Sequence, residues 1–194
     1  MSDKSSQNHL ESEDVLLTAQ LEVGLNLEGF EYKEELFAYS LNSMLLSAND
    51  VLYTLHSDKF ELGSKHHKKL STFDSVSEDL KDIVMYMFGL MNEMKVDTVT
   101  YQDMVNYKAS MPMIMRTDRL LTCSSLIGSI TDLMQTIWLK LAAGVDTPGQ
   151  SDIMNGIGEN EEGVVEHITA HSCHILAAVD TLCHHYGKSI REVL

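Results

Sequence analysis

Apolar residues recur every three or four positions along most of the chain, a spacing that predicts amphipathic helices. A first helix is expected from Asp14. The clearest stripe predicts a helix over 34–55, with apolar positions Phe37, Leu41, Met44, Leu45, Ala48, Leu52 and Leu55. After a polar stretch at 56–73, the next stripe comprises Leu80, Ile83, Val84, Met87, Leu90, Met91 and Met94. We expect Ser75 or Ser77 to cap this helix.

The second half of the chain continues the helical pattern. A short helix is expected at 100–109, and Pro112 marks a break or a helix start. A long helix then runs to about Ala142, with Leu120, Cys123, Ile127, Ile130, Met134, Ile137 and Leu141 facing inward. Residues 144–163 are rich in glycine and acids and predict a flexible loop. The last helix spans about 164–186, with Gly187 as its C-cap. The prediction is an all-α bundle.

The two halves share one plan, which suggests an internal duplication. A shift of 86 positions places Val51 on Ile137, and a shift of 92 places Ile83 on Ile175. We therefore expect a disordered tail at 1–13, a first helical half at 14–110 and a second at 111–194. Four long helices from two such halves would bury one another's apolar stripes as a bundle.

Charge and cysteine content limit the possible functions. The 194 residues carry 14 Lys and Arg against 29 Asp and Glu, a formal charge of −15. Direct binding to nucleic-acid phosphates is not expected, because there is no excess of cations to displace counterions. Cys123, Cys173 and Cys183 form an odd set without CxxC spacing, as in reduced cytoplasmic proteins. No apolar run reaches the ~18 residues of a membrane span, and the polar first dozen residues lack a signal peptide, so we expect a cytoplasmic protein.

Three carboxylates at the start of the second long helix form the first candidate site. Glu78, Asp79 and Asp82 lie close enough on one helix face to share a divalent cation. The alternative is that they only favour the positive end of the helix, where acids are common.

A family resemblance supports the first interpretation. The segments SLNSMLLSANDVLYTL and EDLKDIVMYMFGLMNEMKVD resemble the core helices of the all-α nucleoside triphosphate pyrophosphatases, which include MazG-like proteins, dimeric dUTPases and phage dCTPases. Ala48-Asn49-Asp50 resembles the Ala-Asn-Glu segment of the dUTPases, and 78–82 resembles their EExxD motif. The segment 101–118 is similar to a helix that faces the phosphates. The resemblance covers about residues 15–118.

This resemblance implies a homodimer that uses Mg²⁺ or Mn²⁺ to hydrolyse a nucleoside triphosphate to a monophosphate and pyrophosphate. The implied metal ligands are Glu78, Asp79 and Asp82, with Asp50 as an auxiliary ligand or base beside Asp79. The implied phosphate-binding residues are Lys108, Arg116 and Arg119. The sequence departs from the family at Ser43 and Leu46, where an ExxE motif would place two acids.

Three histidines of the last helix form a second candidate site. His167, His171 and His174 are spaced at i, i+4 and i+7 and so share one face, where they could bind zinc, nickel or iron. Alternatively, they replace the acids of the family and pair with the acidic loop.

Three functions remain open from the sequence. The first is a nucleotide pyrophosphohydrolase, and the second is a non-catalytic descendant of that fold that binds a nucleotide or a protein partner. The third is an acidic decoy for a DNA-binding protein, which the clustering of acids at 11–14, 28–35 and 159–166 disfavours.

Overall fold

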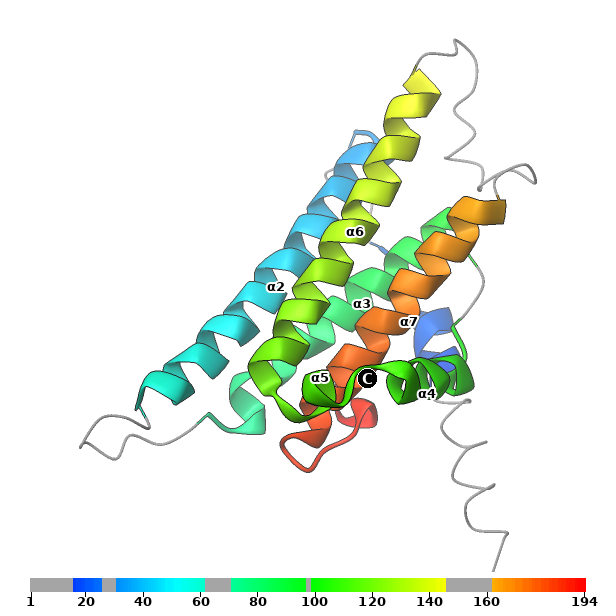
Figure 1. The fold of residues 1–194 in the computed structure, drawn as a ribbon. Coiled ribbons are helices and arrows are strands. Elements are labelled where there is room, and N and C mark those ends of the chain that lie inside the picture. Colours follow the sequence, from blue (N-terminus) through cyan, green and yellow to red (C-terminus); the bar gives the residue numbers. More distant parts are fainter. Residues whose placement is uncertain (1–15, 26–30, 62–70, 97–98, 146–161) are drawn as a thin grey trace, which may run out of the picture.

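Four long helices pack side by side in the computed structural model (Figure 1). The structure describes residues 16–25, 31–61, 71–96, 99–145 and 162–194, and no strand occurs within these ranges. The long helices are α2 (Lys33–Glu61), α3 (Ser77–Met94), α6 (Arg119–Val145) and α7 (Glu162–His184). The predicted all-α class is confirmed. The tail at 1–13 and most of the loop at 144–163 lie outside the described residues.

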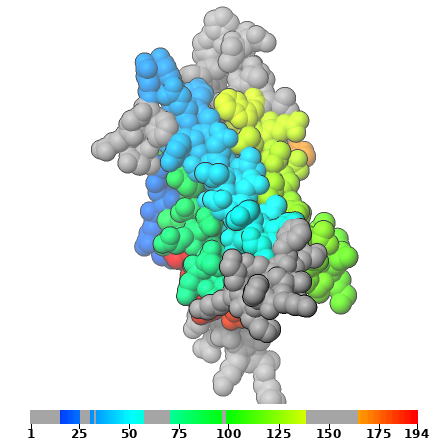
Figure 2. Space-filling view, turned by 90° about the vertical axis from the view of Figure 1, so that its left-hand side faces the viewer, coloured from blue at the N-terminus to red at the C-terminus, as the bar shows by residue number. Residues whose placement is uncertain are grey.

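The helices pair as α2 with α3 and α6 with α7, and α2 also packs along α6. Figure 2 shows α2 running between α3 and α6 on one face of the molecule. Since α3 and α6 run in the same direction in Figure 1, the chain must return between them, and α4 (Tyr101–Ser110) and α5 (Met113–Thr117) make this crossover. Helix α4 packs against α7, so the crossover covers the outer side of that helix.

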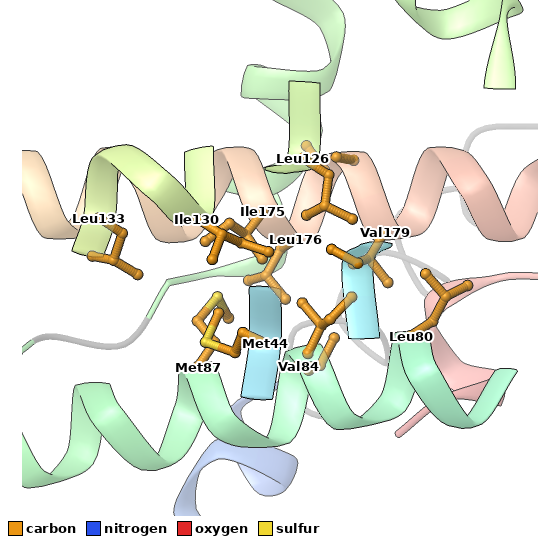
Figure 3. Close-up of a cluster of buried hydrophobic side chains, with 14 of the residues drawn as sticks. Met44, Leu80, Val84, Met87, Leu126, Ile130, Leu133, Ile175, Leu176 and Val179 are labelled. Carbon is orange, nitrogen blue, oxygen red and sulfur yellow. The ribbon is translucent and has the colours of Figure 1, made fainter. Parts of the chain in front are cut away.

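The core lies where the apolar faces of the four long helices meet. Figure 3 shows Met44 of α2, Val84 of α3, Ile130 of α6 and Leu176 of α7 among its side chains. Every residue of the stripe predicted for α3 is buried. The buried apolar residues of α6 are Cys123, Leu126, Ile130, Leu133 and Ile137, so the predicted inward face lacked Leu126 and Leu133. The side chain of the predicted Leu141 lies outside the described residues. Leu120, Ile127 and Met134 are only half-buried.

Local side chains set several helix ends. Thr100 and Asp103 form a capping box at the start of α4, in which Thr100 Oγ1 accepts from the Asp103 amide at 3.1 Å. Asp118 accepts from the amides of Leu120 and Leu121 and separates α5 from α6, a break that the apolar periodicity did not predict. The predicted serine cap of α3 is wrong, because Val76 occupies the N-cap without a side-chain bond.

The N-terminal segment is held on the end of α3. Residues 16–22 are helical, and the Asn92 side-chain amide donates to the carbonyls of Gln20 at 2.6 Å and Val23 at 2.7 Å. Within the described ranges, no helix is long and apolar enough to cross a membrane.

Candidate functional site

The acids predicted on α3 share a surface with Asp50 of α2. Asp79 is half-buried, whereas Asp50, Glu78 and Asp82 are exposed. Burial raises the pKa of Asp79, and the negative charges of Asp50, Asp82 and Glu78 raise it further. Each of these carboxylates is therefore close enough to influence Asp79. The packing of α2 against α3 brings together acids that lie about 30 positions apart in the sequence.

Tyr86 occupies the next turn of this surface. Its side chain hydrogen-bonds to Tyr39 and Ser43 of α2, and burial is the main cause of its raised pKa. The Tyr39 and Tyr86 rings meet edge to face, with centroids 6.1 Å apart. Ser43, where the family would have its first acid, thus contacts a tyrosine. Leu46, at the second such position, is 65% exposed.

Lys108, the first predicted phosphate partner, forms an ion pair with Asp180 of α7. Its Nζ lies 2.5 Å from Asp180 Oδ2 and 3.2 Å from His184 Nδ1. The Asp180 side chain is 4% exposed, and its Oδ1 accepts from the Ile190 amide at 3.1 Å. The ion pair of Lys108 with Asp180 therefore links α4 to α7. The sequence signal for Asp180 was a single acid inside the apolar run HILAAVDTLC.

The two predicted arginines lie at the end of the bundle where α5 leads into α6. Arg116 is exposed, and the Arg119 guanidinium carbon lies 5.5 Å from the centroid of the Tyr186 ring. The Tyr186 hydroxyl also lies 3.1 Å from Ser71 Oγ, in the segment that leads into α3. Arg119 therefore lies at the end of the bundle from which α3 and its acids start.

The histidine face of α7 packs against α6 and α4. His174 Nε2 lies 2.9 Å from Ser125 Oγ, its Nδ1 lies 2.5 Å from Ser129 Oγ, and the Tyr107 ring stacks on the imidazole at 4.9 Å. Both ring nitrogens of His174 are thus hydrogen-bonded. Burial is the main cause that lowers the pKa of His174, which favours its neutral form. The serine pair was not predicted.

His171 lies one turn earlier on α7, close enough to Asp132 of α6 for that charge to affect its pKa. Burial lowers its pKa, the Asp132 charge opposes this effect, and His167 adds to it. The rings of His167 and His171 are nearly parallel, with centroids 6.4 Å apart. Of the predicted trio, His174 is therefore hydrogen-bonded by two serines, and His167 and His171 lie near each other.

The three cysteines are free and buried. Burial raises the pKa of Cys123 and Cys183 to about 12 and that of Cys173 to about 11. They are therefore protonated at neutral pH and are poor nucleophiles. This agrees with the prediction of reduced thiols.

Comparisons of the chain with protein-family models, with curated proteins and with solved structures found no match.

Proposed function

We propose that the protein is a nucleoside triphosphate pyrophosphohydrolase whose site is the α2–α3 surface. The observation that carries the proposal is the convergence of Asp50 with Asp79 and Asp82, whose charges add to the effect of burial in raising the pKa of Asp79. Carboxylates that repel one another are stabilised by a shared cation, so this surface favours a divalent metal ion. The proposed reaction is inferred from the resemblance of the same two segments to the all-α pyrophosphatases.

Mg²⁺ or Mn²⁺ fits these residues as an ion that arrives with the nucleotide. Among the described residues, no three His, Cys, Asp or Glu side chains already form a group that could hold a metal. Mg²⁺ is commonly bound through one or two carboxylates, several waters and the phosphates of the substrate. Asp79 and Asp82 would provide those carboxylates, with Glu78 beside them.

The chain's own residues would orient the triphosphate and remove a proton. Bound metal would neutralise the phosphates and lower the pKa of a nearby water. Asp50, which faces Asp79, would act as an auxiliary ligand or take the proton of the attacking water. The water oxygen would bond to the α-phosphorus, and the bridging oxygen would leave with pyrophosphate. Arg119 and Arg116 would be the phosphate partners that the resemblance implies, whereas Lys108 is held by Asp180.

The test is pyrophosphate release from a panel of ribo- and deoxyribonucleoside triphosphates with Mg²⁺ or Mn²⁺. We expect metal-dependent turnover of one or two nucleotides and its loss in Asp82→Ala, which removes an exposed side chain. Glu22→Ala removes an exposed acid near the opposite end of α3 and is the matched control. Undiminished activity in Asp82→Ala would overturn this site.

A second candidate function, nucleotide or partner binding without catalysis, has its own supporting observation. Leu46 is exposed at a position where the family has an acid, and leucine cannot bind a hard cation. This function would be favoured if the folded protein released no pyrophosphate from any nucleotide tested but had a higher melting temperature in the presence of one of them.

A homodimer is part of the proposal. Tyr39, Leu46 and Tyr53 are 51%, 65% and 74% exposed, and their spacing of seven places them along one side of α2. Such a stripe of large side chains favours pairing with another helix. We expect light scattering to give twice the chain mass, and Leu46→Glu to give the monomer.

A further inference from the structure

The N-terminal segment at 16–25, called the strap below, is bonded to α3 through one side chain. The Asn92 amide donates to the carbonyls of Gln20 and Val23, so it caps the end of the short helix at 16–22. Isolated helices shorter than about 12–15 residues are marginally stable in water, and this one is much shorter. The helical form of the strap therefore depends on its contacts with the rest of the chain.

Gly89 of α3 makes room for the strap. A Cβ added at Gly89 would lie 2.5 Å from Leu25 Cδ2 and 2.7 Å from Leu25 Cγ, closer than side-chain atoms pack. A glycine inside a helix costs stability relative to alanine, and the approach of Leu25 is the packing reason for this one. Leu16, at the other end of the strap, is 1% exposed and belongs to the core. The strap is thus anchored by a leucine at each end.

One buried polar atom of the strap opposes this docking. Gln20 is 2% exposed, and its Oε1 has no hydrogen-bond partner among the described residues. An unpaired buried oxygen loses the hydrogen bonds that it makes to water, and release of the strap would restore them. In exchange, Gln20 Nε2 gains only a 3.4 Å bond to Asn92 Oδ1. The strap is therefore held less firmly than the four long helices, which bury one another's apolar faces.

We propose that the strap leaves α3 as a unit while the bundle stays folded, and that the surface it leaves binds the same segment of a second copy of the chain. This surface comprises Gly89 and Asn92. It recognises a short amphipathic helix that ends in free carbonyls and is followed by a leucine. Gly89 and Asn92 contact only atoms of the strap itself, so the strap of another copy can make the same contacts. Binding of that second strap requires release of the first.

Amide hydrogen exchange of the full chain, read by mass spectrometry, tests the release. We expect the amides of 20–22 to exchange faster than those of α3. Leu16→Ala should speed their exchange at least about thirtyfold, the effect of removing a buried leucine, and should leave the start of α3 unchanged. Leu21→Ala removes a leucine that is 72% exposed, so this matched control should exchange as the parent does. A common exchange rate for the strap and α3 in every variant would overturn the proposal.

A synthetic peptide of residues 14–27, titrated into the full chain, tests the vacated surface. Leu16→Ala weakens the strap but keeps the surface, so it should bind the peptide at least about tenfold more tightly than the parent. Adding Gly89→Val fills the space of Leu25 and should abolish this gain, and adding Asn92→Ala, which brings no extra bulk, should reduce it. Circular dichroism checks that each variant is folded. Equal peptide binding by the parent and Leu16→Ala, or a gain that survives both added changes, would overturn the proposal.

Discussion

Lys95 and Gly187 are the two described residues with a left-handed backbone, with φ of 55° and 70°, and they lie 92 positions apart. Each follows the end of a core helix in the same hydrogen-bonded motif. The Lys95 and Gly187 amides donate to Asn92 and His184, and the next amides, of Val96 and Lys188, donate to Met91 and Cys183. Both ends are Schellman motifs.

The same 92-residue shift aligns the apolar positions of α3 with those of α7. Apolar spacing alone matches between any two amphipathic helices, but a shared left-handed cap at the same register does not follow from it. The two caps therefore occupy matching positions when the chain is shifted by 92 residues.

The two caps predict opposite outcomes for reciprocal substitutions. Lys95→Gly should stabilise the protein by about 1 kcal/mol, because a left-handed conformation costs a non-glycine residue about 1–2 kcal/mol. Gly187→Lys should destabilise it by a similar amount. A Cβ at Gly187 would meet no atom within 4 Å, so the backbone alone determines the cost. Urea unfolding measures both changes, and a destabilised Lys95→Gly variant would contradict the prediction.

Removing either partner of the Lys108–Asp180 ion pair should lower the stability of the protein. Lys108→Met should cost about 2 kcal/mol, less than a fully buried pair because the lysine side chain is 23% exposed. Asp180→Asn keeps an acceptor for the Ile190 amide but removes the charge. The double variant should therefore cost less than the sum of the two single changes.

A phosphate-binding role for Lys108 would give a different result. If Lys108→Met lowered nucleotide turnover but left the urea midpoint unchanged, the lysine would be a substrate contact. We expect the reverse, since Asp180 is nearly buried and depends on this cation.

Asp79→Asn should stabilise the free protein at neutral pH. The folded-state pKa of Asp79 is above its ordinary value of 3.8, so ionisation is less favourable in the folded chain than in the unfolded one. The penalty is absent below pH 3.8 and develops as the pH rises through the folded pKa. The gain of Asp79→Asn should therefore be present at pH 7 and shrink as the pH falls toward 4. An equal gain at all pH values would contradict this cause.

The pattern of the sequence was sufficient for the helices and for part of the site. Every residue of the stripe predicted for α3 is buried, although buried Phe88 was not part of it, and the candidate acids Asp79 and Asp82 were chosen from their spacing on the same helix. Asp118 and Val76 were missed, because a cap depends on which backbone amides one side chain reaches.

The rest of the site required tertiary contacts. Lys108 resembles a phosphate-binding residue in sequence, and only the packing of α4 on α7 shows that Asp180 holds it. The serines that occupy His174 lie 45 and 49 positions away on another helix. No local pattern indicates such a pairing, so the sequence predicted three histidines on one face without the serines that bind one of them.

The histidines predict a protein that is sensitive to mild acid. Burial lowers the pKa of His171, His174 and His185 below the ordinary value of 6.5. As the pH falls below 6.5 the unfolded chain binds protons that the folded chain does not, so stability decreases until the folded pKa values are passed. One such histidine contributes a slope of up to about 1.4 kcal/mol per pH unit.

His171→Gln should reduce this slope, because it removes one of the three titrating groups. Urea midpoints at pH 7.5, 6.5 and 5.5, measured in EDTA so that no metal competes with protons, would give the slopes of the parent and the variant. His56→Gln changes an exposed histidine on α2 and provides the matched control. Identical slopes in the parent and His171→Gln would show that this imidazole is not protonated differently in the two states.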